Sequence, residues 1–119
     1  MDKEKKKLAN KAEKLFKEKI LELADYKCEV CGSNFRITAH HFFPRSSAGH
    51  LIYYIPNGVC LCRGCHFAHH FKSDPTIHQT IVDLRGKRWY NKLLEKKREK
   101  QKSSYKTSQW IQEQIKKLQ

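Results

Sequence analysis

Two C-x-x-C pairs are the feature that most constrains how this chain can fold: Cys28-Glu29-Val30-Cys31 and Cys62-Arg63-Gly64-Cys65. In a chain that starts without a secretory signal, such a duplicated motif indicates metal binding rather than disulfide bonds. Two residues between cysteines allow a tight turn that directs both thiolates at one ion, and Gly32 and Gly64 give such turns backbone freedom. The sequence therefore predicts a closed tetrahedral site for a structural Zn²⁺, with a pair of redox C-x-x-C motifs as the alternative.

The size and composition of the chain explain why such a metal site would matter. The chain has 119 residues, of which 31% are charged and 39% hydrophobic, so it has room for one thin-cored domain with helical arms. Structural zinc contributes about 10–16 kcal/mol in small metal-folded peptides. The uncharged stretch 46–61 contains His50, Pro56, Asn57 and two glycines, which excludes a membrane span. With no apolar block behind the first lysines, we expect a cytoplasmic protein.

The charge of the chain indicates its class of partner. Lysine and arginine number 25 against 12 acidic residues, a formal net charge of +13. All three parts of the chain are positive, and the C-terminal third is the most so. Such a surface attracts polyanions, because each neutralised phosphate releases condensed counterions. Nucleic acid is therefore the expected partner; solvated helical faces on a merely basic protein are the alternative.

The hydrophobic pattern predicts an α+β chain in three parts. Apolar residues recur at helical spacing over 3–23, which predicts an amphipathic helix whose apolar stripe packs on the zinc core. Strands are expected at 35–42 and 59–61, a short strand or turn at 51–55, and a helix opening at His66. We therefore divide the chain into a basic N-terminal helix at 1–24, a zinc core at 25–72, and basic C-terminal helices at 73–119.

The C-terminal part is expected to hold three helices. Asp74 is a candidate N-cap before Pro75, and Gly86 is placed to end that helix. A second helix is expected from Trp89 through the charged run to residue 102, and a break at 103–104 separates it from a last amphipathic helix that ends near Leu118.

Histidines are the residues best suited to chemistry in this chain. Six of the seven lie between His40 and His70. His40 and His41 are neighbours in an expected strand, so they face opposite sides, and one can bind a metal while the other faces substrate or water. His66 follows Cys65 directly, so the zinc site would fix its position. The sequence thus predicts one site formed by His40, His41 and His66.

The histidines and the cysteine pairs together resemble the motif of a known family. His40-His41, Asn57 and His66, framed by the two cysteine pairs, resemble the HNH endonuclease family over residues 28–70. The resemblance implies a small ββα-metal core with a four-cysteine zinc site, flanked here by N- and C-terminal helices. A narrower similarity, to phage recombination endonucleases of the NinG/Rap type, rests on individually common residues: Arg45-Ser46, Asn57, Asp74 and Gly86-Lys87-Arg88-Trp89.

The family resemblance also implies roles for residues of this chain. His40 and His66 would ligate one catalytic divalent ion, Mg²⁺ or Mn²⁺, and some family members add a ligand that corresponds here to His70. His41 would be the general base that activates water. Asn57 would hold the loop and orient His41.

Further residues of the chain have other expected roles. Arg45 would hold a neighbouring phosphate, although an exposed loop arginine is the alternative. We expect His50 and His78 to be structural or exposed, and Cys60 to be a buried strand residue. The role of His69 stays open.

The expected function is hydrolysis of DNA phosphodiester bonds, on duplex or branched DNA, with no small-molecule cofactor. RNA stays open as a substrate, and a two-strand cut would favour a homodimer. The main alternative is a zinc-stabilised DNA-binding module without catalysis. Attachment of c-type haem at Cys62–His66 requires export, for which no signal is present. A zinc finger with two cysteines and two histidines requires more residues between Cys31 and His40.

Overall fold

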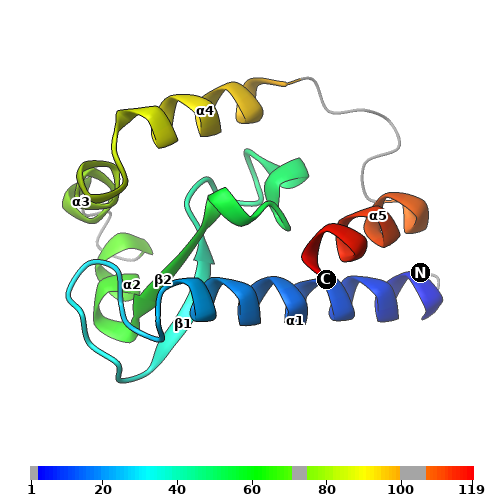
Figure 1. Cartoon of the computed structure of the whole chain (residues 1–119), viewed down its shortest axis with the longest axis horizontal. Helices are drawn as coiled ribbons and strands as arrows, with labels where there is room; N and C mark the ends of the chain where they lie inside the picture. Colours follow the sequence, from blue (N-terminus) through cyan, green and yellow to red (C-terminus); the bar gives the residue numbers. More distant parts are fainter. Residues whose placement is uncertain (1–2, 71–74, 100–106) are drawn as a thin grey trace.

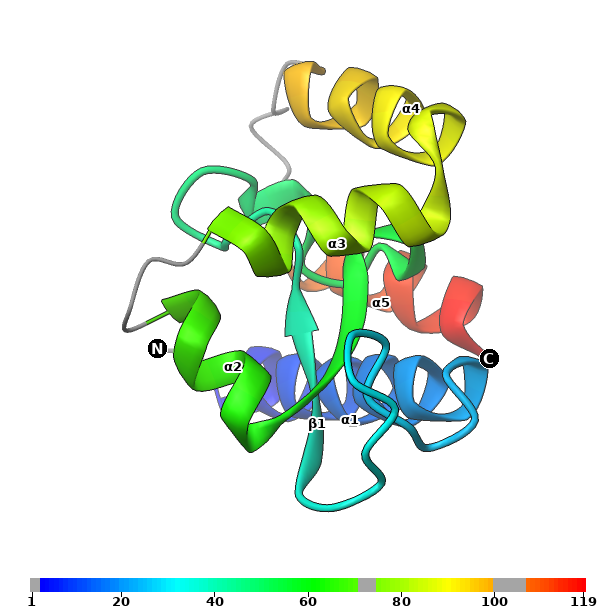
Figure 2. The same cartoon turned by 90° about the vertical axis from the view of Figure 1, so that its left-hand side faces the viewer.

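The structure, a computed structural model, describes residues 3–70, 75–99 and 107–119. It is a small α+β fold in which helices surround a two-stranded sheet (Figures 1 and 2). No described helix is long and apolar enough to cross a membrane. The elements are, in chain order, α1 (Lys3–Leu23), β1 (Ile37–His41), the 3₁₀ turns η1 (Gly49–Leu51) and η2 (Ile55–Asn57), β2 (Gly58–Cys62), α2 (Arg63–His70), α3 (Pro75–Arg85), α4 (Lys87–Arg98) and α5 (Ser108–Leu118).

The two predicted strands form an antiparallel pair. His41 lies opposite Gly58, and Ile37 lies opposite Cys62. The first strand is shorter than the predicted 35–42, because Arg36 has a φ of 52°, outside the extended region that a strand requires. The second strand extends one residue beyond 59–61 at each end. The strand or turn expected at 51–55 is a turn, between η1 and η2.

Each face of the sheet buries a separate hydrophobic cluster, because alternate strand residues point to opposite sides. Val59 and Leu61 of β2 pack against α3 and α4, together with Phe42 and Leu93. The other cluster lies between the sheet, α1 and α5, and it consists of Ala12, Phe16, Ile20, Ala39, Ile52, Tyr53, Cys60, Ile111, Ile115 and Leu118. The prediction that Cys60 is a buried strand residue is confirmed, since it is fully buried.

Helix α1 reaches the sheet where β2 begins. A Cβ atom added at Gly58 would lie 2.1 Å from Cδ1 of Ile20 and 3.0 Å from Cζ of Phe16. Any larger residue at this position would force the Ile20 side chain, or the helix that carries it, to move. As predicted, the apolar stripe of α1 therefore packs on the core, at the strand position opposite His41.

The later helices depart from the prediction only at their ends. Helix α2 begins at Arg63, three residues before the expected start at His66, so it contains half of the second cysteine pair. Gly86 separates α3 from α4, as predicted. Thr107 caps α5 by accepting a hydrogen bond from the amide of Trp110. The predicted cap at Asp74 and the break at 103–104 lie outside the described residues, and the division at 24/25 and 72/73 stays a prediction.

An arginine joins the C-terminal helices to the first cysteine loop. Arg85 of α3 pairs with both carboxylate oxygens of Glu29, at 2.6 and 2.8 Å from its Nη2 atom, and also donates to the carbonyls of Pro56 and Gly58. Glu29 accepts in turn from the amide of Cys60 at 2.8 Å. This charge-assisted network ties the first cysteine pair to β2 and α3.

Candidate nuclease site

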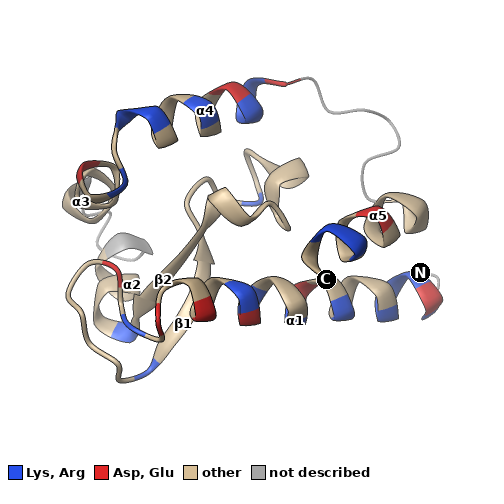
Figure 3. Cartoon of the chain, viewed as in Figure 1, with Lys and Arg blue, Asp and Glu red and all other residues tan. Residues whose placement is uncertain are grey.

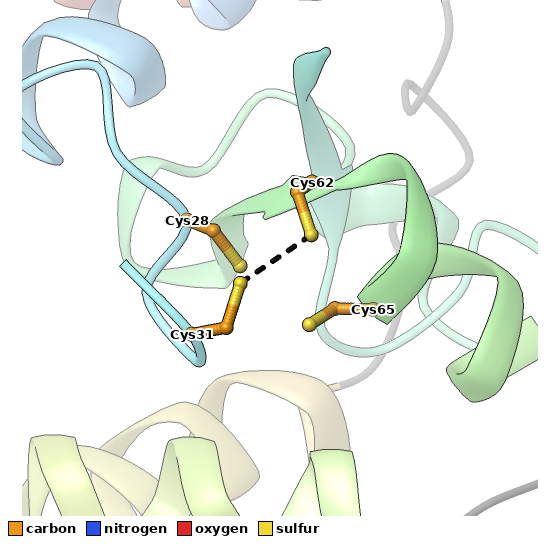
Figure 4. A group of neighbouring side chains, drawn as sticks. All are labelled: Cys28, Cys31, Cys62 and Cys65. Atoms are coloured by element: carbon orange, nitrogen blue, oxygen red, sulfur yellow. Dashed lines mark hydrogen bonds between the residues drawn. The ribbon is translucent and has the colours of Figure 1, made fainter. Parts of the chain in front are cut away.

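The four cysteines of the two C-x-x-C pairs converge from separate parts of the chain (Figure 4). Cys28 and Cys31 lie in the loop before β1, Cys62 ends β2, and Cys65 lies in the first turn of α2. Their sulfur atoms all lie within 4.8 Å of one another, and those of Cys31 and Cys62 are 3.5 Å apart. Four thiolates around Zn²⁺ at about 2.3 Å stand about 3.8 Å apart. The cluster therefore fits a tetrahedral zinc ion.

The backbone around Cys28 favours the thiolate form of this cysteine, whereas burial raises the pKa of Cys65. Burial raises the pKa of the Cys28 thiol, but backbone hydrogen bonds from Cys31, Cys62 and Val30 outweigh it and lower the pKa to about 7. Such a thiol loses its proton readily at neutral pH, and the thiolate is the form that binds metal. Gly32 adopts a φ of 79°, as the tight turn requires, whereas Gly64 lies in α2 and needs no such freedom.

The two histidines proposed as metal ligands are in contact. The rings of His40 on β1 and His66 on α2 stack with centroids 3.7 Å apart and planes 15° apart. The Nε2 atom of His40 also forms a hydrogen bond with the Thr38 hydroxyl on the same strand face. A bound ion lies in the plane of each imidazole that ligates it, so one of these nearly parallel rings must turn before both can hold one ion. The pair fits an imidazole-binding divalent ion by donor type and proximity.

His41 points to the opposite side of β1 from His40, toward α1. Its Nε2 atom lies 2.9 Å from the carbonyl oxygen of Ile52, and its ring stacks on Phe16 with centroids 5.3 Å apart. A carbonyl only accepts, so Nε2 carries the proton and Nδ1 is left as the basic nitrogen. Burial lowers the pKa of His41, although the Ile52 hydrogen bond acts in the opposite direction.

Asn57 holds closed the loop that runs from β1 to β2. It is fully buried, and its Oδ1 atom accepts from the amide of Phe43 at 2.9 Å. Its Nδ2 atom donates to the carbonyls of Phe43 at 3.1 Å and Leu51 at 3.3 Å. Because Leu51 directly precedes Ile52, these bonds hold the segment whose carbonyl fixes His41.

The three histidines open onto one groove of about 720 Å³ between α1, β1 and α2. Four cationic side chains and one carboxylate share it. The lining residues are Glu13, Lys17, Arg36, Thr38, Ala39, His40, His41, Arg45, Arg63 and His66. The carboxylate of Glu13 is paired with Lys17 at 2.9 Å, which leaves the groove strongly positive.

The structure thus brings together His40, His41, His66 and Arg45, with Asn57 behind them. The side chains of His69 and His70 lie outside the described part, so the extra ligand stays a prediction. His50 and His78 lie outside the groove: His50 contacts the carbonyl of Lys96 at 2.7 Å, and His78 stacks on Phe42.

Sequence reasoning missed the contribution of α1 to the site: Glu13 and Lys17 line the groove, and the buried ring of Phe16 supports His41. The apolar spacing of that helix predicts that it packs, but not on which surface. It also missed Arg36 and Arg63. The position of Arg63 inside the second C-x-x-C pair was a usable signal, because the cysteines fix it beside His66.

Comparison with known proteins identifies the central part of the chain. Residues 28–72 match the family model described as HNH endonuclease. No curated protein and no solved structure matches the chain. The narrower similarity to NinG/Rap-type endonucleases stays a prediction. The matched segment contains all four cysteines, the three groove histidines and Asn57. Residues 28–72 are therefore similar to the HNH endonuclease family, over the segment that carries the four-cysteine cluster and the groove histidines.

Proposed function

We propose that this chain is a metal-dependent endonuclease that hydrolyses DNA phosphodiester bonds in the groove between α1, β1 and α2. The observation that carries the proposal is the environment of His41. Its imidazole is fixed in one tautomer by the Ile52 carbonyl and faces a cationic groove beside the His40–His66 pair. An oriented base, a metal-binding pair and a positive surface are the parts that phosphodiester hydrolysis requires.

His41 is proposed as the general base. Its Nδ1 atom takes a proton from water as the water oxygen attacks the scissile phosphorus, and the bond from phosphorus to the 3′ oxygen breaks. The 3′ oxygen then gains a proton from solvent, which leaves 5′-phosphate and 3′-hydroxyl ends. The lowered pKa of His41 keeps the imidazole neutral, and therefore basic, near pH 7.

His40 and His66 are proposed to hold the catalytic divalent ion. Such an ion, when bound, stabilises negative charge on the phosphate and on the leaving oxygen. Mg²⁺ and Mn²⁺ are the candidates, and imidazole ligands suit Mn²⁺ better than Mg²⁺. Both rings lie at the groove wall, and one of them turns out of the stack for the pair to hold one ion.

Arg45 and the other groove cations are proposed to bind the DNA backbone. Arg45 is exposed and lies in the loop after β1, within the same groove as His41. Lysines and arginines also lie along α1 and α4 (Figure 3), so the positive charge continues outside the groove. Contacts with phosphates position DNA without reading its sequence, which supports cleavage that depends little on sequence.

The test is nicking of supercoiled plasmid by the zinc-loaded protein after dialysis to remove weakly bound metal. Added Mn²⁺ or Mg²⁺ should start cleavage, and His41→Ala should lower the rate by about 10²–10⁴-fold without loss of zinc or DNA binding. His50→Ala is the matched control, because His50 lies outside the groove and should retain activity. Conversion to linear plasmid at low enzyme concentration would indicate a dimer.

DNA binding without cleavage in Mg²⁺, Mn²⁺ or Ni²⁺ would overturn the proposal and leave the zinc-stabilised binding module. Loss of cleavage in His50→Ala as large as in His41→Ala would contradict the role of His41. Retention of zinc must be measured in every variant, because an unfolded core would lose activity for another reason.

A further inference from the structure

A second recess of about 440 Å³ lies beside the catalytic groove, between the loop before β1 and the start of α2. It is lined by Ser33, Phe35, Arg36, Cys62, Arg63, Gly64 and Phe67. Figures 1 and 2 show this loop at the end of the sheet next to α2. Arg36 and Arg63 line both the recess and the catalytic groove, so the two are continuous.

Two aromatic side chains of the recess are exposed. Phe35 is 68% exposed and Phe67 is 49% exposed, although most large apolar side chains of the described residues are buried or half-buried. Exposed apolar surface that gathers in one place marks a binding site more often than single exposed residues do. The zinc cysteines hold both segments, since Phe35 follows Cys31 in the same loop and Phe67 lies beside Cys65 in α2.

The charge of the recess indicates what it binds. The guanidinium of Arg36 lies 5.2 Å from the centroid of the Phe35 ring, and Arg63 lies on the same wall. None of the described residues lining the recess is acidic. An apolar or acidic peptide is less well matched than a polyanion with flat apolar groups, because two arginines and two exposed rings share the recess.

We propose that this recess binds an unpaired DNA strand and leads it into the catalytic groove. The bases stack on Phe35 and Phe67, while Arg36 and Arg63 contact the backbone phosphates. Bases inside a duplex have both faces covered by their neighbours, whereas unpaired bases offer a face to an aromatic ring. The preferred substrate is therefore DNA with an unpaired segment, such as a flap, a bubble or a single strand; this last step rests on the proposed function.

The position of the recess beside the proposed zinc site increases its affinity for unpaired bases. A platform held by the metal site loses little conformational freedom when it binds, so less of the stacking energy is spent on ordering. Stacking of a base on an aromatic side chain contributes about 1–3 kcal/mol, which corresponds to about five-fold or more in affinity.

The first experiment measures binding without cleavage. Fluorescence anisotropy of a labelled oligo(dT) strand and of a labelled duplex is measured with zinc-loaded His41→Ala protein and no added catalytic metal. Phe35→Ala and Phe67→Ala, each made in this background, should weaken binding of oligo(dT) by about five-fold or more and leave duplex binding unchanged. Leu84→Ala is the control, because Leu84 is 63% exposed on α3 and lines neither recess nor groove. Equal losses on strand and duplex, or no loss on the strand, would overturn the proposal.

The second experiment separates this inference from the proposed function. With Mn²⁺ and otherwise native protein, cleavage of a flap or bubble substrate should exceed cleavage of the matched duplex, and Phe35→Ala should remove that preference. Strand binding that depends on Phe35 in a protein that never cleaves would support the recess and refute the nuclease. Cleavage that does not depend on Phe35 would support the nuclease and refute the role of the recess. A dimer in sedimentation that dissociates in Phe35→Ala would show that a second copy of the chain covers the recess, and this would also overturn the proposal.

Discussion

The ring of Phe16 on α1 stacks on the imidazole of His41 on β1, with centroids 5.3 Å apart and planes 16° apart. Phe16 is 2% exposed, so the imidazole rests on a fixed apolar surface. The Ile52 carbonyl holds the edge of the same ring at Nε2. The proposed base is therefore fixed on one face and at one edge, and α1, which lies outside the HNH segment, is part of the site.

Phe16→Leu should lower the rate of plasmid nicking at saturating DNA by about 10-fold, because a looser imidazole spends less time in the attacking geometry. The affinity for DNA should change little. The matched control is Ile20→Val, which alters the same helix beside Gly58 and costs about 0.5–1.5 kcal/mol of stability while it leaves the Phe16 ring in place. Equal losses of rate in the two variants, with zinc retained, would show that Phe16 acts only through stability.

Asn57→Ala should strongly destabilise the zinc-loaded protein. The change leaves the amide and carbonyl of Phe43 and the carbonyl of Leu51 without their side-chain partner. Each unpaired buried polar group costs about 1–3 kcal/mol, so we expect a loss of roughly 3 kcal/mol in urea unfolding. Asn57→Asp should not rescue, because a carboxylate offers no donor to the two carbonyls. Asn91→Ala, at an exposed position on α4, should change stability by less than about 0.5 kcal/mol; an equally small effect at Asn57 would contradict the role of the loop clamp.

Removal of zinc should unfold the core. The purified protein should contain one equivalent of zinc, and Co²⁺ in its place should give the absorption bands of tetrahedral thiolate coordination. Cys62→Ser should lose the metal and the cooperative thermal transition, since zinc binding contributes on the order of 10 kcal/mol in comparable small sites. Cys60→Ala is the control, because the Cys60 thiol is not part of the cluster. Full zinc content in Cys62→Ser would be incompatible with the four-cysteine site.

Protonation of His78 should destabilise the protein in mild acid. Burial lowers the pKa of His78 below its ordinary value of about 6.5. The unfolded chain then binds a proton at His78 more readily than the folded chain, so the stability from this group is present above about pH 6.5 and is lost as the pH falls through the folded pKa. His78→Phe keeps a ring against Phe42 but cannot titrate. The stability of this variant relative to the parent should rise between pH 7.5 and pH 5.5 in urea unfolding; a constant difference would rule out a contribution from His78.

The sequence by itself determined the four-cysteine cluster and the order of the elements. The spacing of the two C-x-x-C pairs favours a shared metal site over redox pairs, and the structure brings the four cysteines together. The β-branched and aromatic residues located both strands to within two residues at each end. His66 was predictable as a neighbour of the zinc site because one covalent bond joins it to Cys65. These features depend on residues close together in the chain, so they can be predicted without knowledge of the rest of the fold.

Only the tertiary structure decided what surrounds the histidines. The apolar stripe of α1 shows that this helix packs, but the contact of Phe16 with His41 depends on Gly58, whose missing side chain lets the helix approach. Likewise, the ion pair of Glu29 with Arg85 joins residues far apart in the chain. Long-range contacts of this kind depend on how closely two surfaces can pack and on which buried polar groups still need a partner. The spacing of residues along the chain indicates neither.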